Sequence, residues 1–231
     1  MTSPLQDQHI VITGASGALG QAVVEAFLDR GATCHLPFVE DTPPSRLPWL
    51  DHERVHARAS VNLGDEAAVT AFYGALPALW ASVHLVGGFA MGAIEHTPLE
   101  EFRRMMQINA ETCFLCSRES VRRMGAAGGR IVNVAARPVV QPVGGMVAYV
   151  ASKAAVAAIT QSLAMETADR DILINAVLPS IIDTPANRAA MPDADVDAWP
   201  KPAELAEHIC FLASPANRLT SGALVPIYGR A

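Results

Sequence analysis

Thr13-Gly14-Ala15-Ser16-Gly17-Ala18-Leu19-Gly20 is the stretch that decides the fold of this chain. It directly follows an apolar run, residues 9–13, and opens a helical pattern over residues 18–30. Small residues in a turn between a strand and a helix let the backbone approach a pyrophosphate, and the helix N-terminus adds amide donors and a positive dipole. A tight turn without a ligand is the alternative, although the place of the motif near the N-terminus makes it moderately specific. We expect a dinucleotide to be held by Gly14, Ser16, Gly17, Ala18, Leu19 and Gly20.

Apolar runs alternate with helical periods along the rest of the chain, which is typical of β-α-β units and a parallel sheet. Strands are expected at residues 9–13, 32–38, 54–59, 82–86, 129–135, 172–178 and 223–228. Helices are expected at 18–30, 65–76, 148–170 and 202–213, with two more within 98–125. Residues 183–200 read as irregular. The predicted fold class is α/β: a Rossmann-type doubly wound parallel sheet of about seven strands with helices on both faces, in a single NAD(P)-binding domain over residues 1–231.

Composition narrows the class of protein further. The 231 residues are 51% hydrophobic and 17% charged, which suits one compact domain with a large core. A net charge of -6 and the lack of a Lys/Arg run argue against a nucleic-acid partner. The start lacks a signal-peptide pattern, and we see no apolar stretch near the roughly 18 residues of a membrane span. We expect a cytoplasmic protein that acts on a small molecule away from any membrane.

Tyr149 and Lys153 form the most informative pair of side chains. Four residues apart, they lie on one face of a helix, one above the other. An ammonium there can lower the pKa of the phenol from its usual value of roughly 10 and prepare it for proton transfer. The spacing alone is common by chance, so the pair gains its meaning from the dinucleotide turn that precedes it.

The residues at the end of the second predicted strand bear on the choice between NAD(H) and NADP(H). Phe38 stands where an acidic residue would bind the adenosine ribose, and Glu40 and Asp41 follow shortly after. No Arg or Lys lies there or in the glycine turn to receive a 2′-phosphate. We expect NAD(H) or NADP(H), with a slight preference for NAD(H).

The four cysteines and seven histidines show no ligand spacing for a metal. Cys113 and Cys116 have the spacing of a redox or zinc pair, but they fall in an apolar helical stretch without a second pair. We interpret them as core residues and predict no metal.

The order and spacing of these motifs resemble the short-chain dehydrogenase/reductase family over nearly the whole chain. The resemblance rests on the glycine turn, Asn109 in Ile108-Asn109-Ala110, the Tyr149/Lys153 pair and Pro179 with Thr184. It implies that Tyr149 exchanges a proton with the substrate, that Lys153 holds the nicotinamide ribose and that Asn109 anchors a water that relays protons. It also implies cofactor contacts at Phe38, Asn62, Leu63, Gly87, Gly88, Tyr149, Lys153, Pro179, Ile182 and Thr184.

Three departures from the family pattern point to a narrower group. Ala136 stands thirteen residues before Tyr149, where the family has a catalytic serine. Gly87-Gly88-Phe89-Ala90 replaces the usual Asn-Asn-Ala-Gly, and Gly17-Ala18 departs from the usual glycine turn. All three are similar to dihydropteridine reductases, as are the segments 142–146 and 177–199. The resemblance implies reduction of a quinonoid dihydropterin or a similar planar conjugated acceptor, with substrate contacts at Phe89, Ala136, Met146, Arg188, Met191 and Trp199.

Two other readings of the whole chain remain open. The first is a carbonyl or 3-oxoacyl reductase of the same family in which another group replaces the serine. The second is a nucleotide-binding protein without turnover. In either case the long apolar helices near 102–124 and 148–170 are expected, from the family resemblance, to pair subunits into a homodimer or homotetramer.

Overall fold

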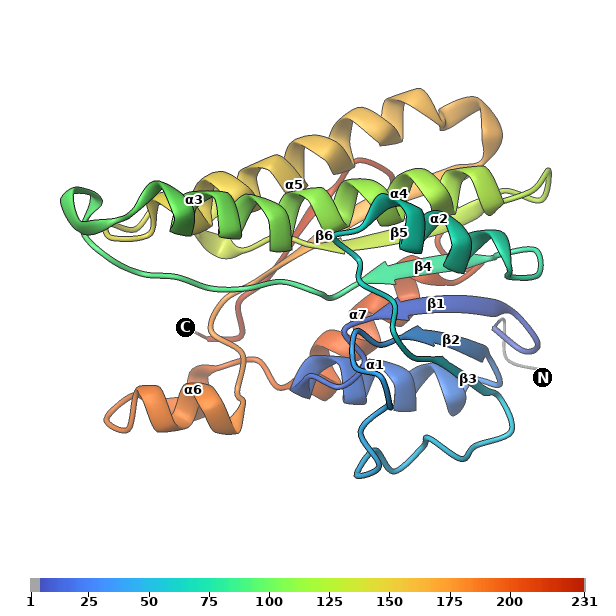
Figure 1. Cartoon of the computed structure of the whole chain (residues 1–231), viewed down its shortest axis with the longest axis horizontal. Helices are drawn as coiled ribbons and strands as arrows, with labels where there is room; N and C mark the ends of the chain where they lie inside the picture. Colours follow the sequence, from blue (N-terminus) through green and yellow to red (C-terminus); the bar gives the residue numbers. More distant parts are fainter. Residues whose placement is uncertain (1–4, 231) are drawn as a thin grey trace.

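The computed structural model describes residues 5–230 and builds them around one seven-stranded parallel sheet (Figure 1). The strand order β3-β2-β1-β4-β5-β6-β7 puts β1 beside β4, where the direction of winding reverses. All seven predicted strands are confirmed, with ends within two residues of those expected. The strands are β1 (His9–Thr13), β2 (Thr33–Pro37), β3 (Val55–Arg58), β4 (Ala81–His84), β5 (Gly129–Val134), β6 (Ile172–Pro179) and β7 (Leu224–Ile227). In such sheets, ligands bind at the carboxyl ends of the strands around this reversal.

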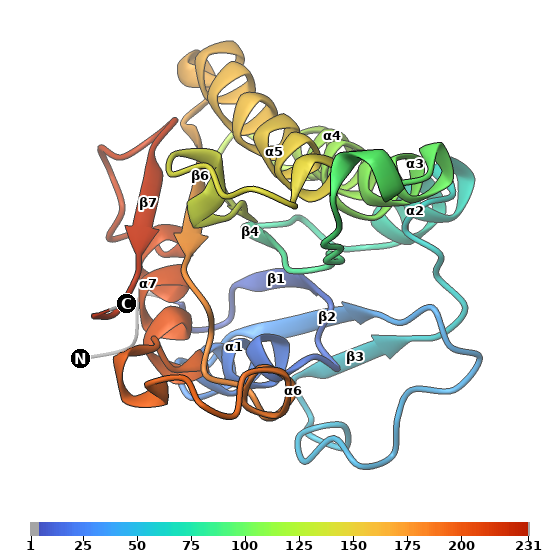
Figure 2. The same cartoon turned by 90° about the vertical axis from the view of Figure 1, so that its left-hand side faces the viewer.

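Helices cover both faces of the sheet, as the doubly wound class requires (Figure 2). Neighbouring residues of β1 point to opposite faces, so Ile10 packs among α1 and α7 residues while Val11 packs among α2 and α4 residues. One face carries α1 (Ala18–Leu28) and α7 (Pro202–Ala213); the other carries α2 (Glu66–Gly74), α4 (Thr112–Arg123) and α5 (Val147–Glu166). The four cysteines are buried and unpaired, which confirms their interpretation as core residues.

The region of the two helices expected within 98–125 is a single run with a widened turn in its middle. α3 (Leu99–Met105) passes into a π-helical segment, Met106–Glu111, and then into α4. Single π-helical turns within α-helices occur frequently at functional sites. Here the widened turn carries Asn109, which is buried.

A short helix, α6 (Pro185–Ala190), interrupts the segment that the sequence suggested would be irregular. The Thr184 side chain caps it by accepting a bond from the Asn187 backbone nitrogen at 3.2 Å, and Pro185 occupies the first turn. Both are ordinary signals of a helix start. The expectation was therefore wrong at this point, because six helical residues are too few to show a period.

α5 is long and apolar enough to cross a membrane by length and composition alone, contrary to our expectation that no such stretch exists. In this structure it packs against β6, and Ala148, Val156 and Ala164 are among its buried residues. Such packing is what a helix of the folded domain shows, so the criterion gives only weak evidence for a span.

Buried polar side chains between the sheet and its helices are joined in one chain of hydrogen bonds. The Tyr73 hydroxyl lies 3.0 Å from the Ser82 hydroxyl, which lies 2.8 Å from His84 Nε2. His84 Nδ1 is 2.8 Å from Asn133 Oδ1, and Asn133 donates to Thr160 on α5 at 2.9 Å. Burial lowers the pKa of His84 to about 4, so the ring is neutral. This chain ties α2 and α5 to the central strands.

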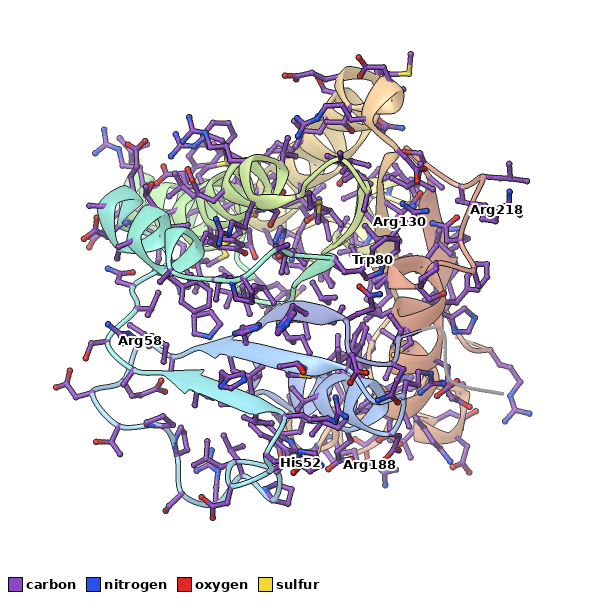
Figure 3. All side chains as sticks on the ribbon, turned by 90° about the vertical axis from the view of Figure 1, so that its right-hand side faces the viewer. His52, Arg58, Trp80, Arg130, Arg188 and Arg218 are labelled. Atoms are coloured by element: carbon purple, nitrogen blue, oxygen red, sulfur yellow. The ribbon has the colours of Figure 1, made fainter. Side chains whose placement is uncertain are left out.

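The amino ends of the strands are closed by Arg130 and Trp80, which Figure 3 labels. The Arg130 guanidinium lies 5.1 Å from the Trp80 ring centre and donates to the carbonyls of Gly129, Asp171 and Asn217. With this edge filled by a satisfied buried cation, the opposite edge is the one available to a ligand.

Candidate active site

The glycine turn joins β1 to α1 at the carboxyl edge of the sheet. Gly14 has a φ of +69°, and a Cβ atom there would lie 3.0 Å from the Val86 backbone nitrogen. A Cβ atom on Gly20 would collide with the Gly14 carbonyl oxygen, so α1 can start this close to β1 only with glycine. Within residues 5–230 no side chain caps the start of α1 at Gly17. Its first amide groups therefore suit an anion such as a pyrophosphate.

A cleft of about 470 Å³ extends from this turn across the ends of β1, β2 and β4. Of the predicted cofactor residues, Gly14, Ser16, Phe38, Asn62 and Leu63 line it. It is also lined by residues that were not among the predicted cofactor contacts: Ala15, Pro37, Val39, Glu40, Val61, Gly64, Val86, Arg104, Gln107, Ile108 and Thr112. The volume of the cleft and its position against the glycine turn fit a dinucleotide cofactor.

The β2 end of the cleft carries a negative charge. Phe38 is almost fully buried there, and its backbone bonds to Arg58 and Val61 hold the end of β2 in place. Glu40 lines the cleft, and its carbonyl accepts a bond from the Ser60 backbone nitrogen at 2.9 Å. A carboxylate at this position disfavours a 2′-phosphate. The expected preference for NAD(H) is therefore compatible with the geometry.

Asn109 ties three segments together behind the candidate catalytic pair. Its side-chain amide donates to the Ser152 hydroxyl at 3.0 Å and to the Gly88 carbonyl at 3.1 Å. Its Oδ1 accepts from the Gly88 backbone nitrogen at 3.0 Å. A Cβ atom on Gly87 would lie 2.7 Å from that same oxygen and 3.1 Å from Lys153 Nζ. Gly87 and Gly88 thus lie so close to Asn109 that a larger residue at position 87 would collide with its side chain.

Tyr149 and Lys153 occupy the first two turns of α5, as the spacing predicted. Lys153 Nζ donates to the Val134 carbonyl at the end of β5, at 2.8 Å. The Ser152 hydroxyl donates to the Tyr149 carbonyl at 2.7 Å, which links the catalytic turn to Asn109. All three predicted catalytic residues therefore meet at the carboxyl edge of the sheet.

The pKa values of the pair differ from the expectation that Lys153 lowers the pKa of the phenol. Burial raises the pKa of Tyr149 to about 12, and burial lowers the pKa of Lys153 to about 8. The Lys153 ammonium is engaged by the Val134 carbonyl. At neutral pH the phenol is protonated and the amine largely charged, which is the state required of a proton donor.

Ala136 and Phe89 are two predicted substrate residues with different surroundings. Ala136 lies two residues after β5 and is 4% exposed, so the serine position is occupied by a buried methyl group. The Phe89 ring meets the Tyr149 ring edge-on, with centroids 5.0 Å apart, and Phe89 is 57% exposed. One side of the phenol is therefore covered by an aromatic ring.

A second pocket, of about 250 Å³, lies on the α3 side of Tyr149. It is lined by Phe89, Ala90, Met91, Gly92, His96, Thr97, Pro98, Glu101, Arg104, Gly145, Met146, Val147 and Ala148. Of the predicted substrate residues, only Phe89 and Met146 take part. The remaining lining residues could not be inferred from the sequence, because no motif marks the loop at residues 90–98.

The predicted cofactor residues at the end of β6 and just after it all make contacts within the protein. Ile182 accepts a bond from Asn187 Nδ2 at 2.8 Å and packs against the core, and Thr184 caps α6. Pro179 ends β6 and pairs with Ile227 of β7. These three hold the base of the segment at the carboxyl edge.

The predicted substrate residues of this segment lie elsewhere. Arg188 forms two hydrogen bonds with the Asp183 carboxylate, at 2.5 and 2.8 Å, so its charge is used within the segment. Trp199 is 5% exposed and anchors the segment to the body, which favours its structural role. Arg188, Met191 and Trp199 are absent from the lining of both described pockets.

Comparison with known proteins identifies the family of the chain. A family model described as short chain dehydrogenase matches residues 8–195. The cis-4-hydroxycyclohexanecarboxylate dehydrogenase of Sinomonas cyclohexanicum is 33% identical over 250 residues, covering 99% of this chain and 98% of that protein. The 2-(R)-hydroxypropyl-CoM dehydrogenase of Xanthobacter autotrophicus is 28% identical and covers 95% and 96%.

Solved structures show the same architecture. A 3-ketoacyl-(acyl-carrier-protein) reductase from Brucella melitensis, complexed with NADH, superposes with a TM-score of 0.86 at 25% identity, covering 98% of this chain and 99% of that one. The aldohexose dehydrogenase of Thermoplasma acidophilum has a TM-score of 0.85 at 24% identity, covering 99% and 95%. These relatives are dehydrogenases and reductases of other substrates, so the dihydropteridine reductase resemblance rests on the residues alone.

Proposed function

The chain belongs to the short-chain dehydrogenase family, and from this premise we propose that it reduces a planar, conjugated acceptor, best represented by a quinonoid dihydropterin. Family membership makes the chain an NAD(P)-dependent oxidoreductase. The class of acceptor is a proposal beyond what family membership gives. The observation that carries it is Ala136, a buried methyl group in the place of the serine.

Ala136 removes a hydrogen-bond donor that a ketone needs. Loss of one such donor to a developing oxyanion costs on the order of 10²–10³ in rate. An electron-poor conjugated ring accepts hydride with less polarisation, so it tolerates the alanine better. Phe89, edge-on to Tyr149, adds an aromatic wall against which a flat heterocycle can lie. The similarity of residues 142–146 and 177–199 to dihydropteridine reductases supports the same acceptor.

The residues of the site have separate roles in the proposed reaction. The turn from Gly14 to Gly20 and the cleft beside it would hold the nicotinamide dinucleotide, which when bound supplies the hydride. Tyr149, protonated at neutral pH, gives its phenolic proton to the acceptor. The Lys153 ammonium stabilises the phenolate left behind, and Asn109 holds Ser152 and Gly88 in place beside it.

A second candidate is reduction of a carbonyl, or oxidation of the matching alcohol. It is favoured by the named relatives, whose substrates are a hydroxycyclohexane carboxylate, a hydroxypropyl thioether and a ketoacyl group. For this candidate another donor must replace the serine, and neither Ala136 nor Phe89 offers one in its side chain.

The test is a panel of turnover measurements with purified protein and either NADH or NADPH. We expect reduction of a quinonoid dihydropterin generated in the assay, with NADH preferred because Glu40 lines the cleft. Reduction of simple ketones without any pterin turnover would refute the pterin proposal. Binding of NADH without turnover of any acceptor would support a nucleotide-binding protein instead.

We also propose that the protein is a homodimer or homotetramer assembled through α4 and α5. Phe114 on α4 is 48% exposed, and Val147 on α5 is 52% exposed, which is apolar surface that a second copy would cover. Sedimentation velocity measures the assembly. A monomer at micromolar concentration would refute it.

A further inference from the structure

His84, at the end of β4, is a buried titratable side chain to which the proposed reaction gives no role. Its hydrogen bonds fix where its proton lies. The Asn133 amide nitrogen donates to Thr160, so the Asn133 oxygen is the atom that faces His84 Nδ1, at 2.8 Å. A carbonyl oxygen only accepts, so Nδ1 carries the hydrogen. Because the ring is neutral, Nε2 carries none, and it accepts from the Ser82 hydroxyl at 2.8 Å.

The chain of buried hydrogen bonds described above therefore runs in one direction, from Tyr73 on α2 to Thr160 on α5. Thr160 ends it by donating within its own helix at 2.9 Å. A longer contact, from the Ser117 hydroxyl at 3.4 Å, reaches the same Nδ1 of His84. Because an unpaired buried acceptor is costly, losing the His84 donor would leave the Asn133 amide free to reorient.

Asn133 and its neighbour Val134 are the residues of β5 to which α5 is hydrogen-bonded within the described part of the chain. Asn133 donates to Thr160, and the Val134 carbonyl accepts from Lys153 Nζ at 2.8 Å. Lys153 and Thr160 are seven residues apart, about two helical turns, so they lie on the same side of α5. These two attachments define how the first turns of α5 lie against the end of β5. With Thr160 released, only Lys153 itself would hydrogen-bond them to it.

We propose that His84 is a positioning residue: through Asn133 it holds α5 against β5 and so keeps Lys153 at its place in the site. The inference rests on the proposed function only in the part that Lys153 has in proton transfer, and it is independent of which acceptor is reduced. Among residues 5–230 no hydrogen bond joins His84 directly to Lys153, so its effect must pass through Asn133.

Two amide substitutions separate the two bonds of the ring. An asparagine amide reaches the place of the ring Nδ1, and a glutamine amide reaches that of Nε2. His84→Asn therefore keeps a donor for Asn133 and loses the partner of Ser82, whereas His84→Gln does the reverse. Each variant removes one buried bond, so a general loss of packing would affect both.

The measurement is the pKa of Lys153, followed by NMR on protein that carries isotope-labelled lysine. The chain has two lysines, Lys153 and the exposed Lys201, so the second signal is an internal reference. A carbonyl that accepts from a buried ammonium favours its charged form, so losing it lowers the pKa. We expect the pKa of Lys153, about 8 in the wild type, to fall by about half a unit or more in His84→Gln and by less than about 0.2 unit in His84→Asn. Burial raises the pKa of the nearby Cys113 thiol to about 11, so this thiol stays uncharged over the titration.

A second pair of variants tests the link from its two ends. Thr160→Val and Tyr73→Phe each remove one buried hydroxyl from the chain, the first on α5 and the second on α2. We expect Thr160→Val to lower the pKa of Lys153 as His84→Gln does, and Tyr73→Phe to leave it within about 0.2 unit of the wild type. This pair keeps the inference open to refutation if His84→Gln does not fold.

The outcomes separate this inference from the proposed function. With any acceptor that the wild type reduces, His84→Gln is expected to lower kcat by about tenfold and His84→Asn by less than about threefold. An unchanged or raised pKa of Lys153 in His84→Gln, or equal changes in both His84 variants, overturns the positioning role. An unchanged pKa in Thr160→Val does the same. If the wild type reduces no acceptor, the proposed function falls, while the NMR titrations still decide the positioning role.

Discussion

The cofactor cleft and the second pocket share Arg104, but different parts of the chain line them. The cleft is formed by strand ends and by a glycine turn in which backbone atoms approach each other too closely for a side chain. The second pocket is lined by loop residues together with the ends of α3 and α5, and two of its loop side chains are largely open to solvent, with Met91 65% exposed and Phe89 57% exposed. The comparison teaches that close backbone packing fixes the shape of the cleft, whereas exposed side chains shape much of the second pocket.

Between these two regions stands Tyr149. Its helix starts at the pocket wall, and its neighbours Ser152 and Lys153 face Asn109 and the end of β5. Changes at Tyr149 should therefore affect the chemistry of every substrate. Changes on the pocket side should affect only the choice among substrates, and changes in the glycine turn should affect stability and the cofactor.

The largest effect is expected from Tyr149→Phe. Removing the hydroxyl takes away the proton donor but keeps the ring that packs against Phe89. We expect kcat to fall by about 10²–10⁴ with the affinity for NADH retained, measured by steady-state kinetics and by cofactor titration. Comparable losses for all acceptors would confirm that Tyr149 belongs to neither region alone.

The control is Tyr228→Phe, at the same edge of the sheet. Its ring lies 4.9 Å from the Arg137 guanidinium carbon, and this contact survives the loss of the hydroxyl. We expect kcat within about twofold of the wild type. If Tyr149→Phe behaved like this control, the role of Tyr149 as proton donor would be disproved.

Ala136→Ser tests how the missing serine affects the choice between a ketone and a pterin substrate. The new hydroxyl lies where the family places its carbonyl donor, so ketone reduction is expected to rise by about 10–100-fold, a part of the 10²–10³ that such a donor contributes. Quinonoid dihydropterin reduction should change by less than about threefold. The measurement is kcat/KM for both acceptors in both proteins. A gain for the pterin that equals the gain for the ketone would contradict our account of why the serine is missing.

Gly20→Ala tests the cofactor side through stability. The added methyl group collides with the Gly14 carbonyl oxygen, so α1 must move away from β1. We expect a loss of about 1–3 kcal/mol in the free energy of unfolding, which corresponds to about 2–12 °C in Tm for a chain of this size. Thermal unfolding without cofactor measures it. Gly17→Ala is the matched control, since its Cβ would lie 3.4 Å from the same oxygen; equal losses in both variants would show that close packing at Gly20 is not the cause.

Prediction from the sequence succeeded where a period or a fixed spacing carries the information. The strands, the glycine turn and the meeting of Asn109, Tyr149 and Lys153 follow from such patterns. α6 was missed because a helix of six residues has no measurable period, although Thr184-Pro185 signalled its start. Arg188 was predicted to contact the substrate, and its pairing with Asp183 was missed because that contact depends on the local path of the chain between them. The second pocket was missed because its lining residues, from 89–104 and 145–148, converge only in three dimensions.

The smallest expected effect concerns the pH dependence of reduction, which depends on Lys153. Burial lowers the pKa of Lys153 to about 8, while the pKa of Tyr149 is about 12. The phenol therefore stays protonated throughout the range of the assay, and raising the pH removes only the charge on Lys153. We expect kcat/KM for reduction to fall to half near pH 8 and by about tenfold near pH 9. The same limb should appear with every acceptor that is reduced, because Lys153 lies outside the second pocket.

Lys153→Arg separates this explanation from a general loss of protein at alkaline pH. Arginine keeps its charge over the whole range, so the normalised profile should lose its limb near pH 8 even if the absolute rate is lower. Lys201→Arg is the control, since Lys201 is the other lysine of the chain and is exposed. Its profile should match the wild type. A limb that persists in Lys153→Arg would assign the pKa near 8 to a different group and would remove the ammonium of Lys153 from the mechanism.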